Sequence, residues 1–152
     1  MRPHALLTSG NHSSGFFNSE LVMEDPVLLD EACSDLVKLL ELAGFNFKIV
    51  ERVVGPAMGA ITLAHEMARH ITYKGRYRNP CLRAYAEKET DGDKKGMAFK
   101  RTKINFAEDV LAVEDVLTTG GSVDLMSKAV AQKGGVILPF VADLVNRSRL
   151  NE

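Results

Sequence analysis

Several features that would assign a protein class are scarce or missing in this chain of 152 residues. Its two cysteines, Cys33 and Cys81, lie far apart, and no cysteine or histidine spacing is typical of a zinc site. We therefore expect free thiols rather than a disulfide, with Cys33 as a small buried residue of a helix. No apolar run approaches membrane-spanning length, and the first residues lack the apolar core of a signal peptide.

An excess of charge of either sign is also missing. The 19 basic and 20 acidic residues nearly cancel, so there is no global basic field for nucleic acid and no acidic block typical of a disordered tail. Internal repeats and low-complexity segments are absent from the sequence. The length suits one domain spanning residues 1–152. We expect a cytoplasmic globular protein with neither a membrane nor a nucleic-acid partner.

Apolar patterning predicts helices alternating with strands. Asp25 and Pro26 are typical of a helix start, and Gly44 is typical of its end. Pro139 lies inside an expected strand and indicates an edge position or a bulge. The alternation predicts an α/β fold with a mainly parallel sheet flanked by helices. The expected helices are 26–43, 60–70 and 122–133; the expected strands are 49–54, 81–86, 110–116 and 136–145; residues 87–101 are expected to form a mobile hairpin or loop.

The most informative stretch covers residues 110–122. An apolar strand leads to the adjacent carboxylates Glu114 and Asp115, and a Thr-Thr-Gly-Gly-Ser turn then leads into an amphipathic helix. Glycines let backbone N–H groups close around a phosphate, and a helix start adds a favourable dipole. The carboxylates can accept hydrogen bonds from ribose hydroxyls. This order of residues is far more restrictive than an ordinary glycine-rich turn, and it favours a phosphorylated sugar as the ligand.

This stretch resembles the phosphoribosyl-pyrophosphate (PRPP) signature of type I phosphoribosyltransferases. Further segments point to the orotate branch of that family: 6–18 is similar to its N-terminal base-covering segment, 54–60 to its pyrophosphate loop, and 85–89 with 97–101 to its flexible catalytic loop. The Asn-Arg-Ser sequence at 146–148 lies near the place where the family has an arginine against orotate. The resemblance implies a small N-terminal hood at about residues 1–24 and a flexible catalytic loop at about 87–101.

The resemblance also implies a set of site residues. Lys88 and Asp115 would be catalytic, and Phe16, Phe17, Thr118 and Arg147 would contact orotate. Lys94, Lys95, Lys100 and Arg101 are weaker candidates for the cation that stabilises the departing pyrophosphate. PRPP would be bound by Glu114, Asp115, Val116, Leu117, Thr118, Thr119, Gly120, Gly121 and Ser122, with pyrophosphate on Gly55, Pro56, Ala57, Met58 and Gly59.

The implied reaction transfers 5-phosphoribose from PRPP to orotate N1, which yields orotidine 5′-phosphate and pyrophosphate. Mg²⁺ is the implied cofactor, held through PRPP and water rather than by direct protein ligands. The family usually forms homodimers in which the flexible loop serves the partner's site, so a homodimer is expected by analogy.

Several residues keep alternative interpretations. Phe16 and Phe17 could be core residues as well as base contacts, and Lys88 could be an exposed loop lysine. His12 is a candidate general base, although histidines outside strong motifs are more often structural. His65 and His70 are spaced i, i+5 and so lack the i, i+4 spacing of a helical metal pair.

Two other functions stay open at this point. The first is a related transferase that acts on another heterocyclic base. The second is a non-catalytic PRPP-binding regulator, motivated by departures from the family pattern. Many orotate enzymes have lysine at the positions of Thr8 and, in some cases, Gly59; Glu87 precedes Lys88 where arginine is usual; no histidine lies in residues 87–101; and the chain ends soon after Ser148.

Overall fold

The computed structural model describes residues 5–6, 12–13, 17–75, 79–92 and 94–148. Its centre is a five-stranded sheet with the strand order β5-β4-β3-β6-β7. Neighbouring strands are parallel except β4 and β5, which are antiparallel. The prediction of an α/β fold with a mainly parallel sheet is confirmed. The strands are β3 (Arg52–Pro56), β4 (Leu82–Asp91), β5 (Lys94–Ala98), β6 (Asp109–Leu117) and β7 (Val136–Asn146).

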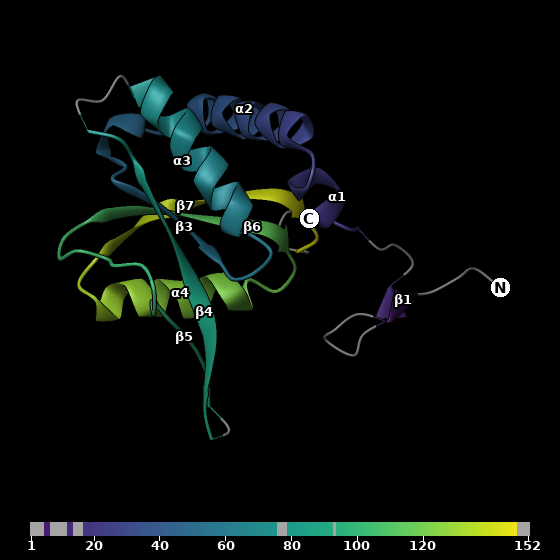
Figure 1. Cartoon of the computed structure of the whole chain (residues 1–152), viewed down its shortest axis with the longest axis vertical. Coiled ribbons are helices and arrows are strands. Elements are labelled where there is room, and N and C mark those ends of the chain that lie inside the picture. Colours follow the sequence, from purple (N-terminus) through teal and green to yellow (C-terminus); the bar gives the residue numbers. More distant parts are fainter. Residues whose placement is uncertain (1–4, 7–11, 14–16, 76–78, 93, 149–152) are drawn as a thin grey trace.

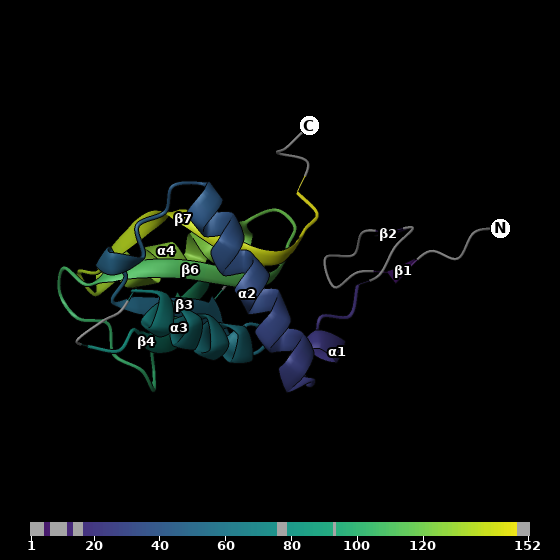
Figure 2. The ribbon, with the colours of Figure 1, turned by 90° about the horizontal axis from the view of Figure 1, so that it is seen from above.

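Helices cover both faces of the sheet. Helices α2 (Pro26–Leu42) and α3 (Ile61–Gly75) pack on one face and α4 (Gly121–Gln132) packs on the other (Figure 1). Seen from the helical side, α3 lies along β3 and β4 while α2 crosses toward β7 (Figure 2). Each face has its own apolar cluster, one against α2 and α3 and the other against α4. β3 is central and therefore buried at every position.

Local sequence signals account for the helix ends. The Asp25 side chain accepts hydrogen bonds from the backbone N–H groups of Val27 and Leu28, so it caps α2 as predicted. Gly44 follows the end of α2 with φ +77°, a conformation that glycine adopts without strain. The helix expected at 60–70 continues to Gly75 because Ile71 adds a further buried position on its inner face.

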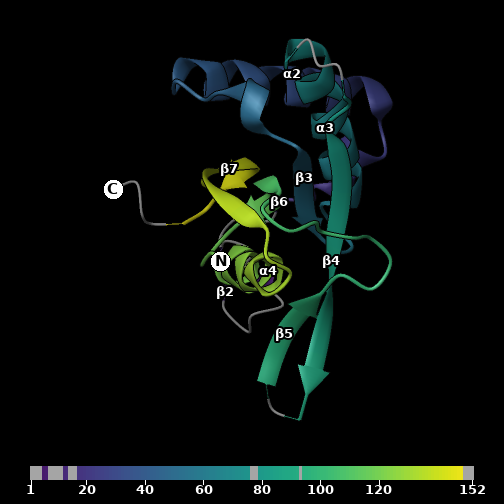
Figure 3. The ribbon, with the colours of Figure 1, turned by 90° about the vertical axis from the view of Figure 1, so that its left-hand side faces the viewer.

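The segment expected as a hairpin or loop at 87–101 forms a hairpin over most of its length. β4 continues past Ala86 to Asp91 and pairs with β5, from Glu87 opposite Ala98 to Asp91 opposite Lys94. This hairpin projects beyond the helices, as the edge-on view shows (Figure 3). The polar residues of β4 fit this position, because the projecting half of the strand has no helix to bury it.

Pro139 lies where its missing N–H is tolerated. β7 is the outer strand of the sheet, so one of its edges has no strand partner within the described residues. Its pairing with β6 is also irregular, since Val110 lies opposite Ile137 whereas Ala112 lies opposite Val141. Both predicted explanations, an edge strand and a bulge, are therefore confirmed.

The N-terminal part forms short elements outside the main sheet. β1 (Ala5–Leu6) and β2 (His12–Ser13) pair antiparallel, and α1 (Glu20–Met23) follows before α2. The side chain of His12 lies outside the described residues, so its role as a base stays a prediction. A membrane-spanning helix would need more length and apolarity than any helix in the described segments has.

Candidate active site

The strand order fixes where a ligand site is expected. The chain passes from β3 through α3 to β4 on one side, and from β6 through α4 to β7 on the other. The topological switch point therefore lies between β3 and β6, and in open α/β sheets ligands bind at the carboxyl ends of the strands at such a point. A cavity of about 520 Å³ lies there, lined from the β3 side by Pro56, Ala57, Met58 and Gly59, from the β6 side by Glu114, Asp115, Val116, Thr118 and Ser122, and further by Phe17, Asn18, Ser19, Lys88 and Arg147.

The turn after β6 is built to present backbone donors. Gly120 has φ +75°, a left-handed conformation that favours glycine, and α4 begins at the next residue. The Asp124 N–H donates to the Gly120 carbonyl, so the N–H groups that precede it in the first turn have no partner within the helix. Thr118 and Ser122 add hydroxyl groups at the cavity. A helix N-terminus with these donors favours an anion such as a phosphate.

Neighbouring side chains of a β-strand normally point to opposite faces of the sheet. Glu114 and Asp115 nevertheless both line the cavity, although β6 continues through Leu117. Their carboxyl groups hydrogen-bond each other. Burial and the neighbouring Asp115 carboxylate raise the pKa of Glu114 to about 8, partly offset by the charge of Lys88. Burial alone would raise the pKa of Asp115 too, but hydrogen bonds from Ser19, from Glu114 and from backbone N–H groups hold it below its usual value. The pair therefore holds one proton and one negative charge at neutral pH.

Lys88 supplies a positive charge at the same cavity. It lies on β4 just beyond the residues that pair with β3, where Pro56 is opposite Ala86. Its side chain is exposed to solvent and lines the cavity that Glu114 also lines. A cation on a projecting hairpin, next to a charged pocket, is suited to stabilising an anionic leaving group.

The loop after β3 approaches the carboxylates closely. A Cβ atom on Gly59 would lie 2.8 Å from Asp115 Oδ2, so a larger residue there would require the carboxylate to shift. The Ala57–Met58 peptide bond is cis. Gly55 is buried and does not line the cavity. A Cβ atom there would lie 2.6 Å from the Ala60 carbonyl oxygen, so the close packing between β3 and the start of α3 requires glycine at this position.

The cavity lining also includes residues from the N-terminal segment and from the end of β7. Phe17 is 39% exposed and lines the cavity, and half-buried Arg147 reaches it from the end of β7. The Arg147 backbone N–H donates to the Leu117 carbonyl at 2.8 Å, which joins this segment to the turn after β6. The sequence predictions did not name Asn18 or Ser19 as site residues: Asn18 ends the segment 6–18 that resembles the base-covering segment, and Ser19 follows it, outside any motif.

Other predicted residues lie apart from the cavity lining. Lys95 and Lys100 are exposed and do not line it, and Arg101 Nε lies 3.5 Å from Glu87 Oε1. Leu117, Thr119, Gly120 and Gly121 belong to the turn without being part of the lining. Phe16 and the side chain of Lys94 fall outside the described residues.

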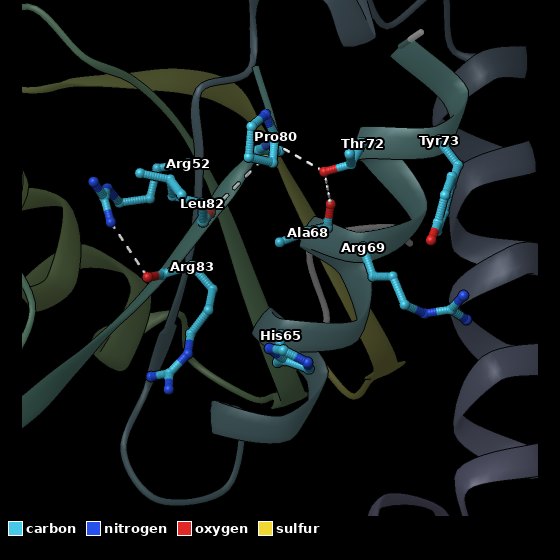
Figure 4. Close-up of a pocket in the computed structure, with 10 residues that line it drawn as sticks. Arg52, His65, Ala68, Arg69, Thr72, Tyr73, Pro80, Leu82 and Arg83 are labelled. Carbon is cyan, nitrogen blue, oxygen red and sulfur yellow. Dashed lines mark hydrogen bonds between the residues drawn. The ribbon is translucent and has the colours of Figure 1, made fainter. Parts of the chain in front are cut away.

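A second cavity, of about 540 Å³, lies between α3 and the first half of β4 (Figure 4). Its floor includes Ala68 and Leu82, with Arg83 and His65 near one end. Among the predicted active-site residues that the structure describes, none contributes to this second cavity. It lies away from the carboxyl ends of the strands that carry the catalytic candidates.

Metal-ligand spacing within the described part of the chain occurs at Asp30, Glu66 and His70. Asp30 comes from α2, while Glu66 and His70 are spaced i, i+4 on α3, a pairing that the sequence predictions did not include. The Arg69 guanidinium pairs with both carboxylates, and His70 Nε2 lies 3.0 Å from Asp30 Oδ1. Because Arg69 already neutralises the acids, we interpret this group as an ion-pair network between two helices.

Comparison with known proteins agrees with this geometry. Residues 30–142 match the phosphoribosyl transferase domain. The chain is 37% identical over 145 residues to the orotate phosphoribosyltransferase of Caldicellulosiruptor bescii, covering 95% of this chain and 67% of that protein. It therefore spans about two thirds of the length of that relative.

Solved structures show the same fold. The orotate phosphoribosyltransferase of Mycobacterium tuberculosis H37Rv superposes with a TM-score of 0.64 at 15% identity, covering 95% of this chain and 87% of that one. The adenine phosphoribosyltransferase of Thermoanaerobacter pseudethanolicus gives a TM-score of 0.63 at 14% identity, with 90% and 89% covered. These two likenesses concern the fold alone. The domain match and the sequence relative together show that the chain belongs to the type I phosphoribosyltransferase family, in its orotate phosphoribosyltransferase branch.

Proposed function

We propose that this chain transfers 5-phosphoribose from PRPP to N1 of orotate, forming orotidine 5′-phosphate and pyrophosphate in pyrimidine biosynthesis. The observation that carries the proposal is the cavity at the switch point, where the PRPP signature, the loop after β3, Lys88 and Arg147 meet. The choice of orotate rests on the sequence relatives, which are named orotate phosphoribosyltransferases.

The PRPP side of the cavity has a group for each part of that substrate. The first turn of α4, with Thr118 and Ser122, would hold the 5′-phosphate through N–H and hydroxyl donors. Asp115 is charged and would accept hydrogen bonds from the ribose hydroxyls. The loop at 56–59 would hold the pyrophosphate through its backbone N–H groups. With both ends of PRPP held, C1′ stays in place while oxocarbenium character develops.

The chemical step breaks the bond between C1′ and the pyrophosphate oxygen and forms the bond between C1′ and orotate N1, and the N1 proton passes to the departing pyrophosphate or to water. Lys88 lines the cavity, and we propose that it stabilises the charge that accumulates on pyrophosphate. The β4–β5 hairpin that carries Lys88 projects from the molecule. By analogy with the family's flexible loop, we propose that it closes over the cavity and excludes water.

The base side of the cavity suits a flat, anionic heterocycle. Phe17 offers a ring for stacking, and Arg147 offers a planar guanidinium that pairs with a carboxylate in a fork geometry. Thr118 lines the same cavity and is proposed as a base contact from the resemblance. Phe16 is proposed as a base contact from the resemblance alone.

Mg²⁺ is proposed as the cofactor. The cavity provides one ionised carboxylate, Asp115, beside Glu114, which burial keeps protonated. This donor set is too small for an all-protein cage, and it fits an ion that keeps its waters and binds mainly to PRPP oxygens. When bound, Mg²⁺ neutralises pyrophosphate charge. A cytoplasmic homodimer, with the hairpin of one subunit near the site of the other, is proposed from the family.

The proposal is tested by a steady-state assay with PRPP, Mg²⁺ and orotate that follows the loss of orotate absorbance. Adenine, hypoxanthine, guanine and uracil are assayed in parallel. We expect turnover with orotate alone. Turnover with another base instead would overturn the assignment of orotate, and PRPP binding without any turnover would identify a binding or regulatory protein.

A further inference from the structure

Ser19 is a cavity residue that no sequence motif identifies. It lies between the N-terminal segment and α1, far from the PRPP signature in sequence. Its hydroxyl donates to Asp115 Oδ2 at 2.6 Å, joining residues 96 positions apart. Its carbonyl accepts hydrogen bonds from the N–H groups of Val22 and Met23, so the first turn of α1 holds its backbone in place.

Asp115 is confined on two sides by this arrangement. Ser19 Oγ bonds to Oδ2, and the same oxygen lies so close to Gly59 that a Cβ atom there would be 2.8 Å away. Backbone N–H groups of Asp115 and Val116 also help to keep the pKa of this carboxyl group below its usual value. A short hydrogen bond to a charged acceptor is among the stronger ones in proteins. The Ser19 hydrogen bond therefore favours the orientation in which the carboxylate lines the cavity.

We propose that Ser19 is a positioning residue for PRPP: its hydroxyl holds the Asp115 carboxylate in the orientation that receives the ribose hydroxyls, and the same bond ties residues 17–19 of the base side to the PRPP motif. The inference rests on the proposed use of Asp115 for PRPP. It adds a residue outside the motif whose removal changes PRPP binding without removing any group that touches the substrate's phosphates.

Loss of the Ser19 hydroxyl should change the pH dependence of PRPP binding, because of the charged groups around Asp115. Ser19 is among the donors that keep the pKa of Asp115 low, while Glu114 on β6 is protonated at neutral pH. Lys88 from β4 and Arg147 from the end of β7 line the same cavity and remain in any Ser19 variant. Loss of the hydroxyl therefore raises the pKa of Asp115, and the pH below which PRPP binding declines moves upward.

The test measures PRPP and Mg²⁺ binding by calorimetry for wild type, Ser19→Ala and Ser19→Thr between pH 4.5 and 8. We expect Ser19→Ala to weaken PRPP binding about tenfold at pH 7, since hydrogen bonds to charged groups contribute on that scale. The pH below which PRPP binding declines should be higher in Ser19→Ala than in wild type. Ser19→Thr keeps the hydroxyl and should bind within about threefold of wild type. In the orotate assay, KM for PRPP should rise more than kcat falls.

A matched control is Ser127→Ala, which removes a hydroxyl that donates to the Val123 carbonyl within α4, away from the cavity lining. It should leave PRPP affinity and its pH dependence unchanged. Wild-type affinity and pH dependence in Ser19→Ala, or equal losses in Ser19→Ala and Ser19→Thr, would overturn the inference. Because PRPP binding is read directly, a wild type that binds PRPP without converting orotate would overturn the proposed function and leave this test intact.

Discussion

Glu114 and Asp115 are neighbouring carboxyl groups with opposite preferences for the proton. The pKa of Glu114 is raised to about 8, mainly by burial and then by Asp115, whereas hydrogen bonds hold the pKa of Asp115 low. A carboxyl group with a raised pKa favours the folded state below its unfolded pKa, and this contribution is lost as pH rises through the folded pKa. The Glu114 contribution should therefore decline between about pH 4.5 and pH 8.

Glu114→Gln should remove this pH dependence, because glutamine keeps the neutral shape and a hydrogen-bond donor for Asp115. The quantity to compare is the unfolding free energy of the variant minus that of wild type. We expect this difference to be about 2 kcal/mol more favourable to the variant at pH 9 than at pH 5, since one pKa unit equals about 1.4 kcal/mol and the cavity partly solvates the group. Urea denaturation at both pH values measures it, with exposed Glu89→Gln as the control. Parallel pH profiles for wild type and Glu114→Gln would contradict the assignment.

Residue roles were predictable where a local order of residue types carries the chemistry. In residues 110–122 the local residue types determine the local conformation, because the glycines allow the left-handed conformation of Gly120 and the amphipathic run after them predicts a new helix. Ser19 was not predictable, because its hydrogen bond spans 96 residues and no local pattern marks it. Gly55 was expected to contact the pyrophosphate, but the close approach of Ala60 is sufficient to explain why this position is glycine.

At the scale of elements, the β4–β5 hairpin presents two kinds of lysine. Lys88 lines the cavity, whereas Lys95 lies opposite Thr90 on the same hairpin, exposed and outside the lining. Lys88→Ala should lower kcat for orotate about 100-fold, because removing one preorganised charge that stabilises a transition state has effects of that size. Lys95→Ala removes the same charge from the hairpin and should stay within about twofold. Equal effects in steady-state assays would mean that the hairpin acts through its overall charge.

The helices and inner strands could be predicted because each buries one apolar face or stripe, which leaves a periodic pattern. The projecting half of β4 could not be predicted from 82–91, because its residues are polar on both faces and its strand character comes from pairing with β5. The same reason explains why the expected strand at 81–86 is shorter than the observed one. Pro139 was informative because an absent N–H restricts the possible neighbours of a strand.

At the scale of the whole molecule, the two ends of the sheet have different tasks. The carboxyl ends of β3 and β6 carry the cavity, and the opposite edge carries a buried ion pair between Arg52 at the start of β3 and Glu108 just before β6. Arg52 Nε and Nη2 donate to the two Glu108 oxygens at 2.9 and 2.8 Å, and Asn105 donates to the same carboxylate. Both side chains are nearly inaccessible, at 6% and 5%.

Stability and PRPP binding should therefore respond independently. Arg52→Ala leaves Glu108 buried without its partner and should cost about 3–5 kcal/mol of unfolding free energy at pH 7, while the Kd for PRPP in the folded protein stays within about twofold. Lys38→Ala, which breaks an exposed pair with Asp35, should cost less than about 1 kcal/mol. Urea denaturation and calorimetry measure the two quantities separately.

The unfolding free energy that Arg52→Ala loses should become smaller as the pH falls. Burial would raise the pKa of Glu108, but hydrogen bonds from Arg52 and Asn105 hold it below its usual value, so its contribution is present above about pH 4.5 and is lost as pH falls. The difference in unfolding free energy between wild type and Arg52→Ala should accordingly shrink from pH 7 to pH 3. A constant difference would mean that Arg52 stabilises the sheet through packing and its bond to the Arg83 carbonyl rather than through the charge of Glu108.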